Sequence, residues 1–556
     1  MLNNNMIWVA NTKEGENIHL LPKMANRHGL VAGATGTGKT VTLKVLAESF
    51  SDMGVPVFMA DVKGDIAGLM CAGEDSENMR ERIARFGLAD AGFSYHGYPV
   101  TLFDIYGQKG IQLRTTISEM GPVLLSRILQ LNDLQSDIMS IVFKIADDNG
   151  LLLIDTKDLK AILAYVAEHN KDFAMDYGNI SKASIAAMQR AVVALEIAGG
   201  DVFFGEPALN IHDFLAVGAG GRGMINILDS ESLINNGKLY STFLLWLLSE
   251  LFEMLPEVGD LEKPKMVFFF DEAHLLFSDA SPALLDKIEQ VVKLIRSKGV
   301  GVYFCTQNPS DIPGGVLAQL GNKIQHALRA YTPAEQKAVR AAAQSFRENP
   351  AFDTYETLMS LGTGEAITSF LDEKGIPGVA QVSYILPPQS RMGSISDAER
   401  DAGIKGSLLY SKYAESHDPD SAYEFLMRLG MEEQEAREKA EQEAAEAKER
   451  EKQEKLEAKE REKQEKLEAK ERERAEKEAA KAQEKAEKEA EKAKQKAENE
   501  RKKTAKTIGS SVTGTIGREV GKTVGGAFGG KFGKTLGGNL GASLGRGLMS
   551  TLFKSK

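Results

Sequence analysis

Cysteine and tryptophan are scarce in this chain, with two residues of each among 556. Cys71 and Cys305 are too few and too far apart to indicate a disulfide framework or a zinc site. The small secreted domains that depend on disulfides are therefore excluded, and a reducing compartment fits the composition better.

Long apolar runs and a basic leader are also missing. The first residues, MLNNNMIW, lack the positive charge and the apolar stretch of a signal peptide. The longest apolar stretch, residues 243–252, is about half as long as a membrane-spanning helix and predicts a buried helix instead. We therefore expect a cytoplasmic protein without a transmembrane segment.

Positive charge is scarce in most of the chain and collects at its C-terminal end. Residues 1–431 hold 37 Lys and Arg against 53 Asp and Glu, whereas residues 507–556 hold 7 against 1. Such an acidic body excludes a protein that coats nucleic acid with its whole surface, because phosphate binding needs clustered cations. A local basic channel is still compatible with this balance.

Residues 1–390 alternate short apolar runs with helical stretches, which predicts an α/β core with a mainly parallel sheet flanked by helices. Residues 365–371 and 378–386 flank a turn and predict a hairpin. The core is expected in two parts, 1–114 and 206–390, with a helical insertion at 115–205 and a connector at 391–431. The other predicted strands are 28–32, 55–60, 224–228, 266–270, 300–306 and 323–328.

Residues 432–506 differ sharply in composition, with 49 charged residues in 75 and an eleven-residue unit repeated at 449–459 and 460–470. Their large apolar side chains, Leu456 and Leu467, are too few for the seam of a coiled coil. A single solvated helix, up to ~110 Å long, is favoured. The alternative is a frayed charged linker.

Residues 507–556 form a basic tail in which glycine recurs at every fourth position from 517 to 545, each time after an apolar residue. Glycine disfavours an isolated helix, but small residues at this spacing let helices approach closely. The interspersed lysines would suit an anionic bilayer. The tail predicts self-association, protein contact or a peripheral position at a membrane, with a flexible tail as the alternative.

The strongest motif is Gly33-Ala-Thr-Gly-Thr-Gly-Lys-Thr40, which follows a predicted strand and precedes a helical stretch. It matches the phosphate loop, whose backbone N–H groups wrap a triphosphate at the start of a helix. Lys39 would neutralise the β- and γ-phosphates, and the Thr40 hydroxyl would bind Mg²⁺. The backbone cradle is expected from Gly33, Ala34, Thr35, Gly36, Thr37 and Gly38.

A second motif, Asp271-Glu-Ala-His274, ends the fully apolar strand 266–270. Asp271 is expected to hold the Mg²⁺ shell, and Glu272 to orient or deprotonate the attacking water. Because adjacent side chains of a strand point in opposite directions, Glu272 must lie just past the strand, where the chain bends. For His274 a packing or supporting role and a catalytic role remain open.

Two further strand ends carry polar residues. Gln307 follows strand 300–306 and would sense the γ-phosphate, unless it only makes a local turn before Pro309. Asp61-Val-Lys-Gly-Asp65 follows strand 55–60, at the edge where open α/β sheets bind ligands. Turn formation by Gly64 is the competing interpretation of this segment.

Together these motifs resemble the HerA/FtsK class of P-loop ATPases and, more narrowly, the bacterial HerA-like C-terminal-domain family. Residues 121–127, 199–207 and 319–333 are also similar to stretches of the narrower family. The resemblance covers about residues 1–390 and does not reach the charged helix or the glycine tail.

The resemblance implies a RecA-like P-loop core, ATP with Mg²⁺, and a homo-hexameric ring whose relatives translocate or unwind DNA. ATP in this class lies between subunits, and a neighbour contributes an arginine to the developing charge. Arg27 and Arg329 are the candidates here, and a surface or salt-bridge role is the alternative for each.

One departure from HerA bears on the partners. HerA carries an N-terminal β-barrel that docks a nuclease, whereas the phosphate loop here begins at residue 33. We therefore do not expect a nuclease partner. The tetrad at 271–274 also occurs in superfamily-two helicases, but its spacing to Gln307 and the lack of a second RecA-like lobe argue against that class.

Three functions fit these observations. The leading one is a ring-shaped Mg²⁺-dependent ATPase that moves DNA through a central pore. The second is ATP-driven remodelling of protein or membrane-associated assemblies, with residues 432–506 as a spacer and the tail as an anchor. The third is a nucleotide-gated scaffold with slow turnover. Because both Lys39 and Glu272 are present, an inactive enzyme is not expected.

Overall fold

The computed structural model describes residues 1–259, 261–277 and 282–497. The chain divides into two units, one of residues 1–427 and one that begins at residue 428. Within the described ranges, no helix combines the length and the apolar character that crossing a membrane requires. The glycine tail predicted at 507–556 lies outside the described residues.

The first unit is built on one sheet, which in the described residues has thirteen strands. The strands lie along the sheet in the order β1, β2, β13, β12, β11, β4, β10, β9, β5, β8, β6 and β7, and β3 pairs with β2. The strands are β1 (Leu2–Asn3), β2 (Met6–Thr12), β3 (Asn17–Leu20), β4 (Gly29–Ala32), β5 (Val57–Asp61), β6 (Val100–Asp104), β7 (Ile111–Gln112), β8 (Ile225–Asp229), β9 (Met266–Phe270), β10 (Val300–Thr306), β11 (Asn322–His326), β12 (Glu365–Ser369) and β13 (Gln381–Ile385).

The sheet has a parallel part and an antiparallel part. From β11 through β4, β10, β9, β5, β8 and β6 to β7, every pair is parallel. From β11 through β12 and β13 to β2, and on to β1 and β3, every pair is antiparallel. This mixed sheet confirms the predicted parallel-rich α/β core and the hairpin formed by β12 and β13.

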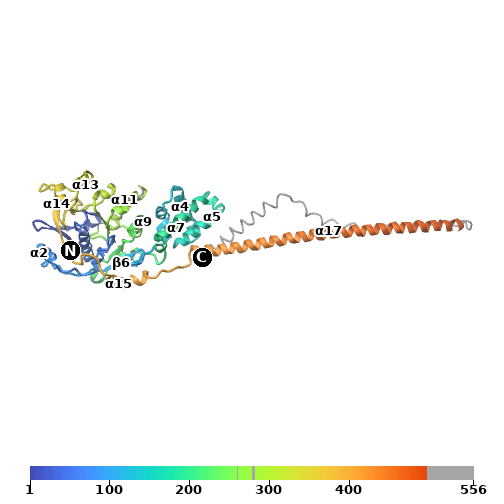
Figure 1. The fold of residues 1–556 in the computed structure, drawn as a ribbon, viewed down its shortest axis with the longest axis horizontal. Coiled ribbons are helices and arrows are strands. Elements are labelled where there is room, and N and C mark those ends of the chain that lie inside the picture. The colour runs from blue at the N-terminus through green and yellow to red at the C-terminus, as the bar shows by residue number, and fades with distance from the viewer. Residues whose placement is uncertain (260, 278–281, 498–556) are drawn as a thin grey trace. The chain divides into compact units, whose positions relative to one another are not determined.

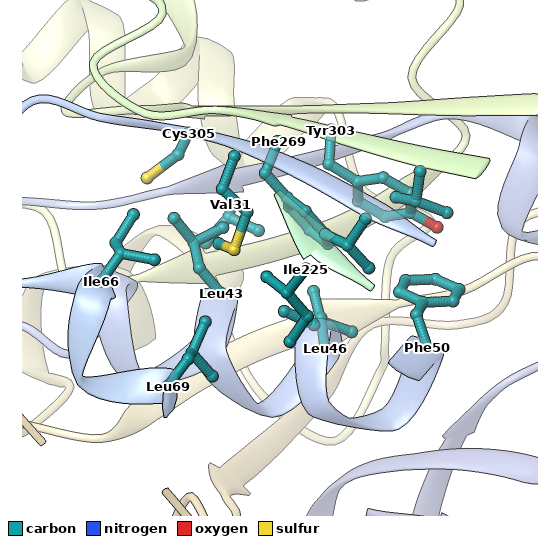
Figure 2. Packing of buried hydrophobic residues seen from close by; sticks show 14 of the residues in the cluster. Val31, Leu43, Leu46, Phe50, Ile66, Leu69, Ile225, Phe269, Tyr303 and Cys305 are labelled. Atoms are coloured by element: carbon teal, nitrogen blue, oxygen red, sulfur yellow. The ribbon is translucent and has the colours of Figure 1, made fainter. Parts of the chain in front are cut away.

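Helix α1 (Lys39–Asp52) begins at the phosphate loop and packs on the centre of the sheet. Figure 2 shows Leu43, Leu46 and Phe50 of this helix facing Phe269 and Tyr303 of the sheet. All five side chains are almost fully buried. Each such side chain contributes ~1.5–3 kcal/mol when removed from water, so this packing holds the start of α1 in a defined place.

The helical insertion contains α3 (Ile117–Ile128), α4 (Asp133–Asp148), α5 (Thr156–Glu168), α6 (Asn170–Tyr177), α7 (Lys182–Leu195) and the short α8 (Asp201–Phe203). No strand occurs between residues 115 and 200, all of which the structure describes. Helices α4, α5 and α7 gather into one cluster (Figure 1). Three of these helices begin at capping boxes, formed by Thr116 and Glu119, Asn132 and Gln135, and Asp155 and Asp158.

The apolar stretch at 243–252 lies in α9 (Gly237–Met254), and its Phe243, Trp246 and Leu251 side chains are buried. The interpretation as a buried helix is therefore confirmed. The remaining helices of this unit are α2 (Glu77–Arg85), α10 (His274–Phe277), α11 (Pro282–Ile295), α12 (Gly314–Leu317), α13 (Pro333–Gln344), α14 (Thr354–Ser360), α15 (Asp397–Gly406) and α16 (Tyr410–Tyr413).

The charged segment forms one continuous helix, α17 (Ala422–Ala497), which starts ten residues before the predicted boundary at 432. The described side chains between Glu432 and Ala482 are exposed. A solvated helix was predicted, and the alternative of a frayed linker is wrong for the described part of this segment. Residues 498–506 of the predicted segment lie outside the described residues.

Strands β4, β5, β8, β9, β10 and β11 were predicted from the sequence, whereas β1, β2, β3, β6 and β7 were not. The strand β6 (Val100–Asp104) is the most consequential omission because it lies in the parallel part of the sheet, next to β8. Its apolar run is short and comes directly after Pro99, which reads locally as a loop. Pairing with β8 makes it a strand, and local pattern does not reveal that pairing.

Candidate functional site

The predicted motifs meet at one edge of the sheet. Strands β4, β10, β9 and β5 are neighbours and run in parallel, so their carboxyl ends lie side by side. The phosphate loop follows β4, Gln307 follows β10, and Asp271 with Glu272 follows β9. Asp61 ends β5. Such an edge is where ligands bind in open α/β sheets.

The start of the phosphate loop is hydrogen-bonded to the ends of the two strands on either side of β4. The N–H of Gly33 donates to the Thr306 carbonyl at 3.2 Å, and the N–H of Ala34 donates to the Ala327 carbonyl at 2.8 Å. Gly36 and Gly38 have φ values of 78° and 110°, which favour glycine. The loop backbone is thus already shaped by its neighbours rather than by a ligand.

Lys39 lies over this loop and is buried. Its Nζ donates to the carbonyl oxygens of Gly33 at 2.6 Å and Ala34 at 3.1 Å. Thr40, the next residue, is partly exposed in the first turn of α1. The amino group is therefore placed at the mouth of the loop, where the phosphates of a nucleotide would lie.

His326, at the end of β11, lies against the phosphate loop and the first turns of α1. The sequence alone gave this residue no role of its own. One ring nitrogen lies 2.8 Å from Thr42 Oγ1 and the other lies 2.9 Å from the Glu365 carbonyl oxygen. A Cβ on Gly33 would come within 2.5 Å of the His326 Cβ. Burial lowers the pKa of His326 to about 4, so the ring is neutral beside Lys39 at neutral pH.

Asp271 has the environment of a cation ligand. Its side chain is buried, and its Oδ2 has no hydrogen-bond partner among the described residues. Burial raises the pKa of its carboxyl, and the neighbouring Glu272 adds to this effect. A buried oxygen without a partner is costly unless a cation or donor meets it. The residue therefore fits the predicted Mg²⁺ site, which Thr40 would share.

Glu272 lies just past β9, at the bend that the sequence predicted, and has a φ of 47°. Its carboxylate is nearly buried and accepts hydrogen bonds from Lys63 Nζ at 2.6 Å and from Gln307 Nε2 at 3.3 Å. Nδ1 of His274 lies 3.3 Å from its Oε2. Burial opposes ionisation, but Lys63 and Gln307 outweigh it and lower the pKa of Glu272.

Lys63 is a second residue of the site to which the sequence assigned no role. It belongs to the loop after β5, where the Asp61 carboxylate accepts the backbone N–H groups of Lys63, Gly64 and Ile66 at 2.8–3.2 Å. The turn is thus present at the end of β5, and a ligand-binding role of residues 61–65 stays a prediction. The motif itself was recognised, and only the neighbourhood of β5 and β9 gives its lysine a partner.

The two candidate arginines do not reach the other site residues. Arg27 ends a short 3-10 turn (Pro22–Arg27) before β4, so it lies at the opposite end of that strand from the phosphate loop. Its side chain makes no hydrogen bond or ion pair with the described residues. Arg329 donates to the carbonyls of Leu328, Met359 and Leu361, which secures the C-terminal end of α14.

Comparisons with known proteins show which family the chain resembles. The family model described as "Helicase HerA-like C-terminal" matches residues 7–533. The match continues beyond residue 390, so the expectation that the resemblance ends there is wrong.

Among curated relatives, the DNA double-strand break repair helicase HerA of Sulfurisphaera tokodaii is 24% identical over 355 residues, which are 61% of this chain and 62% of the relative. A probable helicase of Methanocaldococcus jannaschii, MJECL08, is 32% identical over 145 residues, which are 25% of this chain and 26% of the relative. The chain thus spans less than two thirds of the relatives' length.

Among solved structures, the bacterial conjugative coupling protein TrwBdeltaN70 has a TM-score of 0.48 and 15% identity, with 71% of this chain and 92% of that chain covered.

Proposed function

The chain belongs to the HerA-like C-terminal helicase family, and on that premise we propose that it is an Mg²⁺-dependent ATPase whose turnover moves or unwinds DNA. One observation carries this proposal. The phosphate loop, the buried Asp271 oxygen without a partner and the Glu272 carboxylate meet at the carboxyl edge of four neighbouring parallel strands.

The loop residues would bind the triphosphate. The backbone N–H groups of residues 33–38 and the N-terminal end of α1 favour negative charge, and Lys39 adds a cation beside them. When bound by Thr40 and Asp271, Mg²⁺ would draw charge away from the phosphate oxygens.

Glu272 would act on the attacking water. As the water oxygen bonds to the γ-phosphorus and ADP leaves, the carboxylate accepts the proton that the water loses. Gln307 is bonded to this carboxylate, so it would orient Glu272 and contact the γ-phosphate. His274 lies against the same carboxylate and is proposed as a supporting residue.

A homo-hexameric ring is part of the proposal and rests on the family. Between the two arginines, Arg27 is favoured as the residue given to a neighbouring site, because Arg329 is already engaged by three backbone carbonyls. Arg27 could act only on another subunit's nucleotide, since β4 separates it from the loop of its own subunit.

DNA is the favoured substrate because the relatives named above carry the description helicase. A nuclease partner is not proposed. The second candidate function, remodelling of a protein or membrane-associated assembly from the cytoplasmic side, is favoured by α17, a 76-residue helix of ~114 Å at 1.5 Å per residue whose side chains from Glu432 to Ala482 are exposed.

The test is the ATPase rate of the purified full chain, alone and with single- or double-stranded DNA, beside E272Q. We expect DNA to raise the rate severalfold and E272Q to lower kcat by at least about a hundredfold, as loss of a general base does. E231Q is the matched control, because Glu231 follows β8, two strands along the sheet from β9, and pairs with Lys109 instead.

A substantial rate that is indifferent to DNA would favour the second function. A wild-type rate in E272Q would overturn the assignment of the catalytic carboxylate.

A further inference from the structure

The ion pair between Lys63 and Glu272 joins two loops that are 209 positions apart in the chain. The Lys63 side chain is 41% exposed, whereas that of Glu272 is only 6% exposed. The pair therefore lies at the mouth of the site, with its mobile cationic partner on the solvent side and its carboxylate on the inner side.

The backbone that carries Lys63 is held firmly. The Asp61 carboxylate bonds three N–H groups of this loop, and Gly64 adopts a φ of 73° that allows the turn. Only the flexible side chain of Lys63 is left to move. It can release Glu272 by rotating, without any change in the loop.

In this arrangement both oxygens of Glu272 are engaged. Oε1 receives the Lys63 ammonium, while Oε2 receives the Gln307 amide and faces His274. A carboxylate that is to take a proton from water needs a free lone pair directed at that water. Each oxygen keeps a second lone pair, but the Lys63 ammonium at Oε1 competes with water for the carboxylate, and we take this arrangement as its resting state.

An anion that arrives beside Glu272 changes this balance. Lys63 is drawn to whichever neighbour carries more accessible negative charge, and a terminal phosphate carries more charge than one carboxylate. The repulsion between Glu272 and that phosphate also increases the benefit of placing the ammonium between them.

We propose that Lys63 is a γ-phosphate-responsive positioning residue, which holds Glu272 in a resting position and transfers to the terminal phosphate when a nucleoside triphosphate binds. A diphosphate leaves the ion pair intact because it lacks the group that competes for the lysine. The proposal rests on the proposed ATPase function and adds to it a means of distinguishing triphosphate from diphosphate.

The experiment measures the Kd of the full chain for Mg²⁺ with AMP-PNP and for Mg²⁺ with ADP in four forms: wild type, K63M, K63R and E272Q. Methionine keeps the apolar stem of the lysine and removes its charge. In K63M we expect the preference for AMP-PNP over ADP to fall by about tenfold, the scale of one bond to a charged group. K63R should restore most of the preference.

A double variant, K63M/E272Q, tests the link between the two residues. Wild-type Lys63 must leave Glu272 before it binds phosphate, whereas in E272Q it is free to bind from the start. Loss of Lys63 should therefore change AMP-PNP affinity by different amounts in the E272Q background and in the wild type, and ADP affinity should change in neither.

K109M is the matched control. Lys109 lies at the same edge of the sheet, after β6, and forms an ion pair with Glu231 at a similar exposure of 39%. Its removal should leave the preference between the two nucleotides unchanged, because Glu231 lies against Gly64 but makes no hydrogen bond or ion pair with Lys63 or Glu272. The thermal midpoint of each variant shows whether it is folded.

Equal effects of K63M on AMP-PNP and ADP, or additive effects in the double variant, would overturn the proposal for Lys63. Those outcomes leave the ATPase proposal standing when wild type hydrolyses ATP and E272Q does not. A wild-type protein that binds neither nucleotide would instead overturn both.

Discussion

At the scale of single residues, a proposed catalytic residue has an unfavourable backbone conformation. Glu272 has left-handed backbone although it is not glycine, a state that costs of the order of 1–3 kcal/mol. It persists because Lys63, Gln307 and the strand β9 hold the residue in place. The strain brings the carboxylate over the strand ends instead of into the sheet.

His28 is a second residue in an unfavourable state. It is buried with a φ of 58°, and its Nδ1 accepts the N–H of Val302 at 3.0 Å. Burial lowers its pKa to about 4, and the charges of Arg296 and Arg27 act in the same direction. In an unfolded chain the pKa of histidine is ~6.5.

Between these two pKa values the unfolded chain binds one more proton than the folded chain at this position. The free energy of unfolding therefore loses ~1.4 kcal/mol per pH unit as the pH falls from ~6.5 towards ~4. We predict that H28N removes this contribution and makes the stability less dependent on pH. The Asn amide oxygen can accept the same N–H.

Urea unfolding of wild type and H28N at several pH values between 7 and 5 measures the difference. Exposed His212 supplies the control variant H212N, which should follow the wild type. Parallel stability curves for H28N and wild type would show that His28 does not titrate as described.

At the scale of elements, α17 differs from every helix of the first unit in what stabilises it. Its charged side chains form ion pairs four residues apart, with the acidic residue first, and these side chains are mostly solvated. This order is the favourable one on a helix. The pairs are Glu446–Arg450, Glu451–Lys455, Glu462–Lys466 and Glu473–Lys477.

We predict that salt lowers the helix content of α17, because exposed ion pairs are screened once the Debye length falls to ~3 Å at about 1 M. Circular dichroism at 222 nm of the full chain should show a broad loss of signal as salt rises, separate from the cooperative unfolding of the first unit. The same titration on a chain ending at Met427 is the control. An unchanged signal in the full chain would mean that packing or self-association holds α17 together.

At the scale of the whole molecule, the described site residues all belong to the first unit, residues 1–427. This unit also contains the sheet and the buried core around α1. Among the described residues of the second unit, 428–497, none contributes a group that the site uses. The proposed ATPase site and the described part of the C-terminal segment thus belong to different units.

We predict that a chain ending at Met427 keeps its ATPase rate without DNA within about twofold, and unfolds cooperatively at the same midpoint within a few degrees, since an independent core sets both. Sedimentation with anionic vesicles should then separate the functions. If the tail is an anchor, the full chain binds the vesicles and the shortened chain does not. Loss of the DNA-independent rate on truncation would place the C-terminal segment within the catalytic assembly.

The sequence by itself determined the features that depend on neighbouring residues. The phosphate loop lies between a strand and a helix, Glu272 lies at a bend after an apolar strand, and α17 follows from charge spacing. Each of these features depends on residues that are close together in the sequence, so a short stretch is enough to predict it. The P-loop α/β fold could also be predicted, because alternating apolar runs and helices allow few other arrangements.

The tertiary structure alone decided which strand ends become neighbours. That order places Lys63 against Glu272, sets His326 beneath the phosphate loop, and leaves Arg27 at the far edge of the sheet. It also makes Val100–Asp104 a strand, by pairing it with β8. Such contacts join residues hundreds of positions apart, and their energy comes from burial and hydrogen bonding in the assembled sheet, which no local pattern of residues encodes.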